Sequence, residues 1–374
     1  MQYLSTRDEK LRKSAAEAIV MGLSRDGGLY TPVSFPSLPD GAVESLAKLP
    51  YAQRAAKIMK LFLDEFSEEE LLSFTEKGYA CPEKFDDAAV APVVTLGEST
   101  HMLELWHGPT CAFKDMALQM LPYLLTASLK KTGETRTVCI LVATSGDTGK
   151  AALEGFRDVA GTKILVFYPK DGVSDIQKLQ MVTQEGKNVG VCSVIGNFDD
   201  AQTGVKRIFS DEALRAELDG RGYFLSSANS INWGRILPQV VYYISAYCDL
   251  VAAGKIQNGD KLNFCVPTGN FGNILAGFFA KLMGLPVGRL ICASNENNVL
   301  TDFISTGIYD RNRPFYATSS PSMDILISSN LERLLYLLSG SDEEVRGYMD
   351  SLNKTGRYEV SPELREKLGQ SFSC

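Results

Sequence analysis

The run Thr137-Val138-Cys139-Ile140-Leu141-Val142 leads into the turn Thr144-Ser145-Gly146-Asp147-Thr148-Gly149. The first segment is apolar and rich in β-branched residues, which predicts a buried strand. The second combines glycines with short polar side chains, which predicts a turn, and a helix is expected from about Lys150. Ligands of open α/β sheets bind at the carboxyl ends of the strands, so this turn is a candidate binding site.

The same order of strand, turn and helix recurs further along the chain. Other strands are predicted at 163–168, 188–195, 262–266 and 289–293. Strands that alternate with helices form parallel sheets in α/β proteins. The strand at 262–266 is followed by Gly269-Asn270-Phe271-Gly272-Asn273 and then by an apolar helix at 274–283. The sequence therefore predicts an α/β fold with a second strand-to-helix turn near residue 270.

The composition is that of a soluble globular protein with room for two or three domains. The chain has 374 residues, of which 45% are hydrophobic and 22% charged, an ordinary balance. The net charge of −7 comes without a basic block, so nucleic acid is not an expected partner. No run approaches the length of a membrane span, and residues 1–13 lack the apolar core of a signal peptide. A cytoplasmic protein with no membrane association is expected.

The cysteines and histidines do not form a metal-binding pattern. The eight cysteines are scattered, several of them in hydrophobic runs such as Val138-Cys139-Ile140, where reduced cysteines pack as small apolar residues. No Cys-x-x-Cys pair occurs, and the two histidines are His101 and His107. Neither disulfides nor a metal site is therefore expected.

The chain is expected to have three parts. Residues 1–92 have a polar, mostly helical pattern, with a helix opening at Glu68-Glu69-Glu70. Residues 93–230 and 231–374 carry the β-rich runs, and each is expected to form a parallel-sheet domain. A helix predicted at 233–250 lies close to the second boundary and can bridge it.

A lysine with the surroundings of a nucleophile precedes the first of these turns. It lies in His107-Gly108-Pro109-Thr110-Cys111-Ala112-Phe113-Lys114-Asp115, just before the largely apolar run 116–121 at the start of a predicted helix. Removal from water disfavours the ammonium form of a lysine. A neutral amine can form a Schiff base with an aldehyde cofactor. Lys114 is therefore the candidate catalytic residue.

The motifs at 107–115, 144–149 and 269–273, in this order, resemble threonine synthase, a fold-type-II enzyme dependent on pyridoxal phosphate (PLP). The resemblance extends from Asp26-Gly27-Gly28-Leu29-Tyr30-Thr31-Pro32 to Asn330-Leu331-Glu332-Arg333. It implies the type-II fold, with two parallel-sheet domains and a helical N-terminal region. It also implies that Lys114 binds PLP as a Schiff base and later acts as acid and base.

The resemblance assigns further residues to three binding tasks. The first group would hold the phosphate of PLP, as N–H groups and a helix dipole do at a glycine-containing helix start: Gly269, Asn270, Phe271, Gly272 and Asn273. The second would bind the substrate carboxylate: Thr144, Ser145, Asp147 and Thr148. The third would bind the substrate phosphate: Asn229, Ser230 and Arg235. A planar guanidinium suits an oxyanion, so the substrate class depends most on Arg235.

Several residues keep a second interpretation. Gly269 and Gly272 could simply relieve backbone strain in a turn, and Arg235 could be a solvated residue after a helix cap. In many fold-type-II relatives the residue at the position of Asp147 is an asparagine that bonds the 3′-oxygen of the cofactor. Asp147 must therefore be protonated there or point elsewhere. His107 could be a general base, although a histidine before a Gly-Pro turn usually orients backbone. Cys111 could be reactive, although packing is the commoner role.

The activity implied by the resemblance is conversion of O-phospho-L-homoserine and water to L-threonine and phosphate, by γ-elimination and β-hydration. The alternatives are a related PLP-dependent phospho-lyase, a serine/threonine dehydratase, which would not need Arg235, and a catalytically silent binding protein. Fold-type-II enzymes are often dimers, so a homodimer is one expected assembly. The family's late hydroxyl beside the pyridine nitrogen has no match after about residue 340, so the part at 231–374 is expected to lack the family's C-terminal segment.

Overall fold

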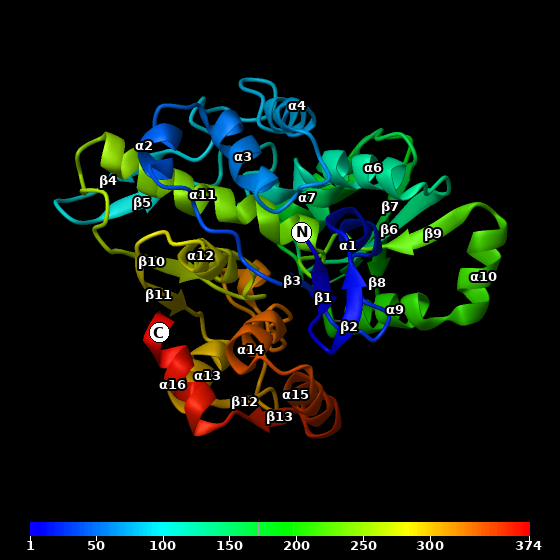
Figure 1. Ribbon diagram of the computed structural model, residues 1–374. Helices are drawn as coiled ribbons and strands as arrows, with labels where there is room; N and C mark the ends of the chain where they lie inside the picture. The colour runs from blue at the N-terminus through cyan, green and yellow to red at the C-terminus, as the bar shows by residue number, and fades with distance from the viewer. Residues whose placement is uncertain (171, 197) are drawn as a thin grey trace. The chain divides into compact units, whose positions relative to one another are not determined.

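The computed structural model describes residues 1–170, 172–196 and 198–374 (Figure 1). Contacts between Cα atoms divide the chain into two compact units. The Lys114 unit contains 15–23 and 50–238, and the Gly269 unit contains 1–14, 24–49 and 239–374. The chain passes from one unit to the other inside helix α11 (Trp233–Ala252), at Pro238. The two units divide the first 92 residues between them, and the three-part division drawn from the sequence stays a prediction.

The Lys114 unit is built around a parallel sheet with strand order β8-β7-β6-β9. Its strands are β6 (Thr137–Ala143), β7 (Thr162–Pro169), β8 (Val189–Val194) and β9 (Tyr223–Ser226). A separate antiparallel pair is formed by β4 (Val93–Thr95) and β5 (His101–Leu103). The helices are α1 (Ala15–Met21), α3 (Tyr51–Lys60), α4 (Glu68–Gly78), α5 (Asp115–Leu118), α6 (Leu121–Thr132), α7 (Asp147–Phe156), α8 (Asp175–Val182), α9 (Phe198–Ser210), α10 (Glu212–Gly220) and the start of α11.

Helices cover both faces of this sheet. Alternate residues of a strand point to opposite faces, and Leu141 packs with Ala201 and Val205 of α9. On the other face α7 lies so close that a Cβ on Gly149 would meet a methyl of Val166 at 2.9 Å. The turn at 144–149 follows the carboxyl end of β6 and leads into α7. The close packing of α7 on the sheet therefore fixes the position of this turn.

The Gly269 unit contains a second parallel sheet with strand order β10-β11-β14. The strands of this unit are β1 (Tyr3–Ser5), β2 (Asp8–Lys13), β3 (Tyr30–Pro32), β10 (Leu262–Pro267), β11 (Val287–Ala293), β12 (Ile308–Asp310), β13 (Arg357–Glu359) and β14 (Phe372–Ser373). Its helices are α2 (Ala42–Leu46), the remainder of α11, α12 (Gly272–Leu282), α13 (Val299–Thr306), α14 (Leu331–Ser339), α15 (Asp342–Thr355), α16 (Pro362–Ser371) and a short 3-10 turn (Pro321–Met323).

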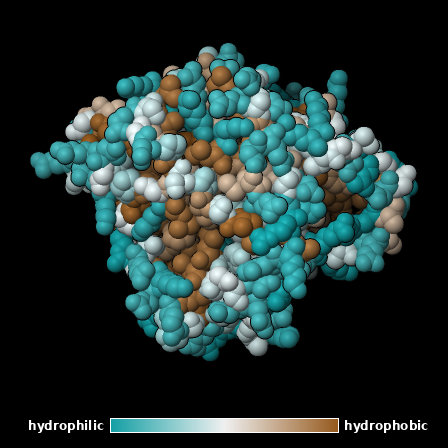
Figure 2. Space-filling view, viewed as in Figure 1, coloured by the Kyte–Doolittle hydropathy of each residue, from teal (hydrophilic) through white to brown (hydrophobic). Residues whose placement is uncertain are grey.

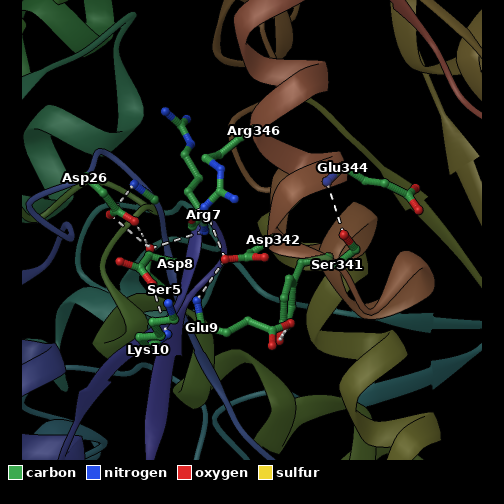
Figure 3. Close-up of polar contacts among 12 residues, drawn as sticks. Ser5, Arg7, Asp8, Glu9, Lys10, Asp26, Ser341, Asp342, Glu344 and Arg346 are labelled. Carbon is green, nitrogen blue, oxygen red and sulfur yellow. Dashed lines mark hydrogen bonds and ion pairs between the residues drawn. The ribbon is translucent and has the colours of Figure 1, made fainter.

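Charged residues fasten the β1–β2 hairpin to α14 and α15 within the Gly269 unit. Arg7 forms an ion pair with Glu332 at 2.7 Å and donates a second bond to it through Nε. The backbone N–H of Glu9 donates to Asp342, which also pairs with Arg346 (Figure 3). Segments more than 300 residues apart in sequence are thereby joined.

The predicted strands and the predicted helices at 150, 233–250 and 274–283 are confirmed, with boundaries shifted by a few residues. The α/β fold with two parallel sheets is as expected. The antiparallel sheet β2-β1-β3 was not predicted, because β2 is polar and follows only a three-residue strand. No helix in the described part of the chain is long and apolar enough to cross a membrane, and hydrophilic residues cover most of the face in Figure 2.

Candidate active site

Lys114 is a buried residue at the start of a helix. It is the N-cap of α5 and only 8% exposed. Its Nζ lies 4.4 Å from the centre of the Phe113 ring and donates to Oδ2 of Asp147 at 2.5 Å. The predicted nucleophile is therefore held between an aromatic face and a carboxylate.

The surroundings of Lys114 act on its protonation in opposite directions. Burial is the largest influence and lowers the pKa of the amine, because the ammonium loses its hydration. The carboxylate of Asp147 opposes this shift, and the positive charge of Arg235 adds to it. The net pKa of Lys114 lies below its ordinary value, so the neutral amine is more accessible than that of a solvated lysine.

The turn between β6 and α7 is held together by Thr144. This residue is 2% exposed, and its Oγ1 accepts from the N–H groups of Gly146 at 3.0 Å and Gly149 at 2.9 Å. Gly146 has a φ of 148°, and a Cβ there would meet the side-chain oxygen of Gln177 at 2.0 Å. Thr144 thus shapes the turn. Its contact with a substrate carboxylate stays a prediction.

The remaining members of the predicted carboxylate group differ in their surroundings. Ser145 and Thr148 are partly exposed. Asp147 is the first residue of α7 and points to the amine of Lys114. One of the two alternatives for Asp147 is thereby favoured: the carboxylate is aimed at a cation.

The predicted substrate-phosphate residues gather after β9, with Arg235 in the first turn of α11. Asn229 donates through Nδ2 to the carbonyl of Ala143 at 3.2 Å, which links this segment to the end of β6. Arg235 is 2% exposed and donates through Nη1 to the carbonyl of Ala228. A guanidinium has five N–H donors in a planar fork, a geometry that matches an oxyanion. Arg235 is therefore a buried cation and not the solvated residue of the alternative interpretation.

The loop before α12 is fixed by neutral hydrogen bonds within the Gly269 unit. Ser328 donates through Oγ to the carbonyl of Gly269 at 2.7 Å. The backbone N–H and the Nδ2 of Asn330 both donate to the carbonyl of Asn270 at 3.1 Å. Phe271 has a left-handed φ of 63° and α12 begins at Gly272. These contacts use carbonyl oxygens of the loop as acceptors. The first N–H groups of a helix have no acceptor within the helix itself.

Asn273 is held by two tyrosines. The hydroxyls of Tyr242 and Tyr243 both donate to its Oδ1 at 2.7 Å. Because the oxygen is taken by these two donors, the side-chain amide of Asn273 is fixed at the start of α12. Its predicted role toward a phosphate would fall to its N–H groups.

His107 and Cys111 lie in the loop that leads to Lys114. The ring of His107 bonds Asp86 at 2.7 Å and Glu104 at 2.8 Å. The bond to Glu104 is the largest of the influences that raise the pKa of His107. Cys111 is exposed and has a left-handed φ of 56°. His107 therefore ties neighbouring segments together, which favours the orienting role over the catalytic one.

An open pocket of about 560 Å³ lies beside this loop in the Lys114 unit. Its wall includes Trp106, Cys111, Phe113, Asp147 and Gln177. The described residues contain no group of three or more histidine, cysteine, aspartate or glutamate side chains that could hold a metal ion.

Comparison with known proteins agrees with this arrangement. The family model of the threonine synthase N terminus matches residues 2–79, and the family model of pyridoxal-phosphate dependent enzymes matches residues 95–363. Threonine synthase of Saccharomyces cerevisiae is 38% identical over 395 residues, which cover 99% of this chain and 75% of that protein. The chain belongs to the threonine synthase family. Its members depend on PLP, and the matched segment includes Lys114 and the loop at 269–273.

Solved structures of this family have the same fold. PLP-bound threonine synthase from Brucella melitensis has a TM-score of 0.90 at 39% identity, and the match covers 100% of this chain and 77% of that chain. Human threonine synthase-like 1 is 43% identical over 371 residues, which cover 96% of this chain and 49% of that protein. The chain thus spans about half the length of the threonine synthase-like relatives it matches.

The residues present fit the cofactor of the threonine synthase family. An aldehyde needs an amine that can lose its proton, and Lys114 is buried with a lowered pKa. A phosphate needs N–H donors and no obstructing side chain. A Cβ on Gly269 would already be 3.3 Å from Cα of Met323, so the glycine keeps this loop narrow. The Lys114 unit thus contains an amine suited to an aldehyde, and the Gly269 unit contains a glycine loop suited to a phosphate.

Sequence reasoning missed the residues that fix these loops. Asp115 was not recognised as the anchor of the lysine loop, nor Gln177 as the neighbour of Gly146. The bonds of Ser328 and Asn330 to the carbonyls of Gly269 and Asn270 were not predicted either. The short polar residues next to Lys114 were the available signal, but their partners depend on the folded loop.

Proposed function

We propose that the chain is a threonine synthase that converts O-phospho-L-homoserine and water to L-threonine and phosphate. The observation that carries this proposal is the buried amine of Lys114. Its Nζ lies 2.5 Å from Oδ2 of Asp147, and the positive charge of the buried Arg235 contributes to the lowering of its pKa. A simple dehydratase of serine or threonine has no phosphate to bind and would not need a second buried cation there.

The proposal divides substrate binding between two segments of the Lys114 unit. Arg235, with Asn229 and Ser230, would bind the phosphate of the substrate, because a guanidinium binds oxyanions through a planar pair of donors. The turn at 144–149 would bind the substrate carboxylate through its N–H groups and the hydroxyls of Ser145 and Thr148. Both segments lie at the carboxyl ends of β6 and β9, where open α/β sheets bind ligands.

Lys114 would hold the cofactor and then move protons. Bound PLP supplies an electron sink for the charge that develops at Cα and Cβ of the substrate. The amine of Lys114 takes a proton from carbon and returns one later, which requires a pKa closer to neutrality than that of a solvated lysine. Asp147 holds Nζ in place and stabilises its protonated form between the two transfers. Burial of the site keeps bulk water from competing for these protons.

A second candidate function is supported by the names of the relatives. The human protein at 43% identity is named threonine synthase-like 1. A phospho-lyase that releases phosphate without adding water at Cβ would use the same amine and the same Arg235. A serine/threonine dehydratase would use the amine but would not need Arg235, and a catalytically silent protein would bind PLP without turnover.

One incubation separates these functions. The purified chain with PLP is given O-phospho-L-homoserine, and inorganic phosphate and threonine are measured in the same sample. Equal amounts of the two products are expected. Phosphate without threonine would identify a phospho-lyase. Neither product, together with a 2-oxo acid from serine or threonine, would identify a dehydratase, and no product from any of these substrates would contradict an enzymatic role.

A further inference from the structure

Asp115, next to the lysine, is a buried carboxylate with both oxygens bound to one threonine. It is fully buried, and its Oδ2 accepts from the backbone N–H of Thr110 at 2.8 Å. Its Oδ1 accepts from the hydroxyl of Thr110, also at 2.8 Å. We call this pair the Asp115–Thr110 clasp. A buried carboxylate is costly unless it is hydrogen-bonded, so these two bonds fix the loop between the two residues.

Gly108 lets the loop close over the clasp. A Cβ at this position would lie 2.5 Å from Cβ of Asp115 and 2.7 Å from its Oδ2, so a side chain here would force Asp115 to shift. The backbone N–H of Asp115 also donates to the carbonyl of Ala112 at 2.9 Å. The segment 108–115 is therefore a closed loop that ends at Asp115, and Lys114 is the residue that immediately precedes this anchor.

We propose that Asp115 is a positioning residue, whose clasp to Thr110 holds the loop so that the amine of Lys114 stays buried beside Asp147. The stem of Lys114 leaves the backbone one residue before the clasp, at the N-cap of α5. Release of the clasp frees 108–112, and the lysine can then leave its buried place beside Asp147 and turn into solvent. The proposal deepens the proposed function, on which it rests for the task of the amine.

The charged groups around the amine define what this release would change. Lys114 faces Asp147 from α7 and the charge of Arg235 from α11, and burial lowers the pKa of its amine. An amine that turns into solvent regains its hydration and its ordinary pKa. The pH at which Lys114 becomes reactive therefore reports its position, whereas a loss of stability alone would leave that pH unchanged.

The Gly269 unit contains a matched clasp for comparison. Asp324 is 4% exposed, and it accepts from the N–H of Thr318 at 2.9 Å and from the hydroxyl of Thr318 at 2.7 Å. The residue before it, Met323, lies against Gly269. These two bonds repeat those of Asp115 and Thr110 in the unit that does not contain Lys114, and Asp324 also accepts from Nδ2 of Asn295 at 2.7 Å and of Asn297 at 3.1 Å. Its removal is therefore a control for the general cost of losing a buried carboxylate.

The test measures where and how fast Lys114 reacts. The cofactor-free chain, Asp115→Ala, Asp115→Asn and Asp324→Ala are incubated with pyridoxal, which has the aldehyde but lacks the phosphate. Borohydride then traps the product, and the fraction of Lys114 modified is read from its peptide by mass spectrometry over a range of pH. Because pyridoxal has no phosphate, the result does not depend on the loop at 269–273.

Asp115→Ala should lower the trapping rate at Lys114 by about tenfold at pH 7.5, the effect of losing one to two buried hydrogen bonds, and should move the pH midpoint upward. Asp115→Asn should resemble the wild type, because its amide can accept from the N–H of Thr110 and donate to the hydroxyl. Asp324→Ala should trap like the wild type. A folded Asp115→Ala with the wild-type rate and midpoint would overturn the proposal, as would an equal change in Asp324→Ala.

Amide hydrogen exchange keeps this result separate from the proposed function. In the cofactor-free chain, exchange at 108–115 should speed up in Asp115→Ala and not in Asp324→Ala. Unchanged exchange at Thr110 in Asp115→Ala would also overturn the proposal. Lys114 that does not react in the wild type would instead contradict the proposed function, and exchange would still decide whether Asp115 fixes the loop.

Discussion

The lysine loop at 108–115 and the phosphate loop at 269–273 are built alike and fastened differently. Each contains a non-glycine residue in the left-handed region, Cys111 with φ 56° and Phe271 with φ 63°. The lysine loop is held by the carboxylate of Asp115 and adjoins a second carboxylate, Asp147. The phosphate loop is held by hydroxyl and amide groups, including Ser328 and Asn330.

The difference agrees with the two tasks proposed for these loops. An amine that exchanges protons needs ionisable neighbours, because they set its pKa. A loop that binds a phosphate through N–H groups can be held by neutral supports, which leave the N–H groups and the helix dipole as the local field. A change of pH should therefore affect the Lys114 unit and have much less effect on the Gly269 unit.

The largest effect is expected from Lys114→Ala. Loss of the proton-transferring amine should lower product formation from O-phospho-L-homoserine by about 1,000-fold. Thermal stability should change only as much as replacement of a buried lysine by alanine requires. Steady-state phosphate release is the measurement. Lys131→Ala, which removes an amine paired with Glu70 on the surface, should keep wild-type activity. Comparable activity in Lys114→Ala would remove the lysine loop from the mechanism.

Stability should depend on pH through Asp115. Burial, its largest influence, raises the pKa of Asp115 to about 6 from an ordinary 3.8. The folded state thus binds this proton more tightly than the unfolded chain, so the stabilisation is complete below about pH 3.8 and is lost as pH rises through about 6. Relative to Asp115→Asn, the wild type should lose up to about 3 kcal/mol of unfolding free energy between pH 4 and pH 7. Denaturant titrations measure this, and a constant difference between the two proteins would contradict it.

Arg235→Lys should separate the two phosphates. Lysine keeps the charge but loses the planar pair of donors, so KM for O-phospho-L-homoserine should rise by about 10- to 100-fold, as for the loss of charge-assisted hydrogen bonds. The affinity for PLP, measured by fluorescence titration, should change far less. Arg221→Lys, an exposed residue paired with Glu217, is the matched control. Equal losses for substrate and PLP would undo the division between the two phosphate sites.

Two glycine substitutions should rank the tightness of the loops. Gly108→Ala places a methyl 2.5 Å from Cβ of Asp115 and should cost about 1–3 kcal/mol. Gly269→Ala meets Met323 at 3.3 Å, a contact that small shifts relieve, and should cost less. Gly347→Ala in α15 meets nothing within 4 Å and should be neutral or stabilising. Thermal unfolding gives the order, and a larger loss for Gly269→Ala would reverse it.

The smallest effect is expected from His107→Gln. The bonds to Glu104 and Asp86 raise the pKa of His107, so its contribution to stability is present at low pH and is lost as pH rises through that pKa. Because these groups are near the surface, the variant should lose only about 0.5 kcal/mol at pH 5.5 and less at pH 8. Activity should be unchanged. A tenfold loss of activity at constant stability would instead make His107 catalytic.

The sequence predicted the elements of both sheets because their strands are apolar and their turns contain glycine. It predicted Lys114 from its apolar flanks, and the structure buries that residue next to Asp147. It did not predict the clasp of Asp115 and Thr110, since a charged residue after a lysine is more often solvated. The supports of the phosphate loop were also out of reach, because Ser328 lies 59 residues from Gly269.

The central claim is that PLP is attached at Lys114. The measurement that tests it most directly is borohydride reduction of the wild-type chain with PLP, followed by dialysis and peptide mapping. The account predicts one modified lysine, at position 114, with little modification elsewhere. An unmodified Lys114, or attachment at another lysine, would contradict it.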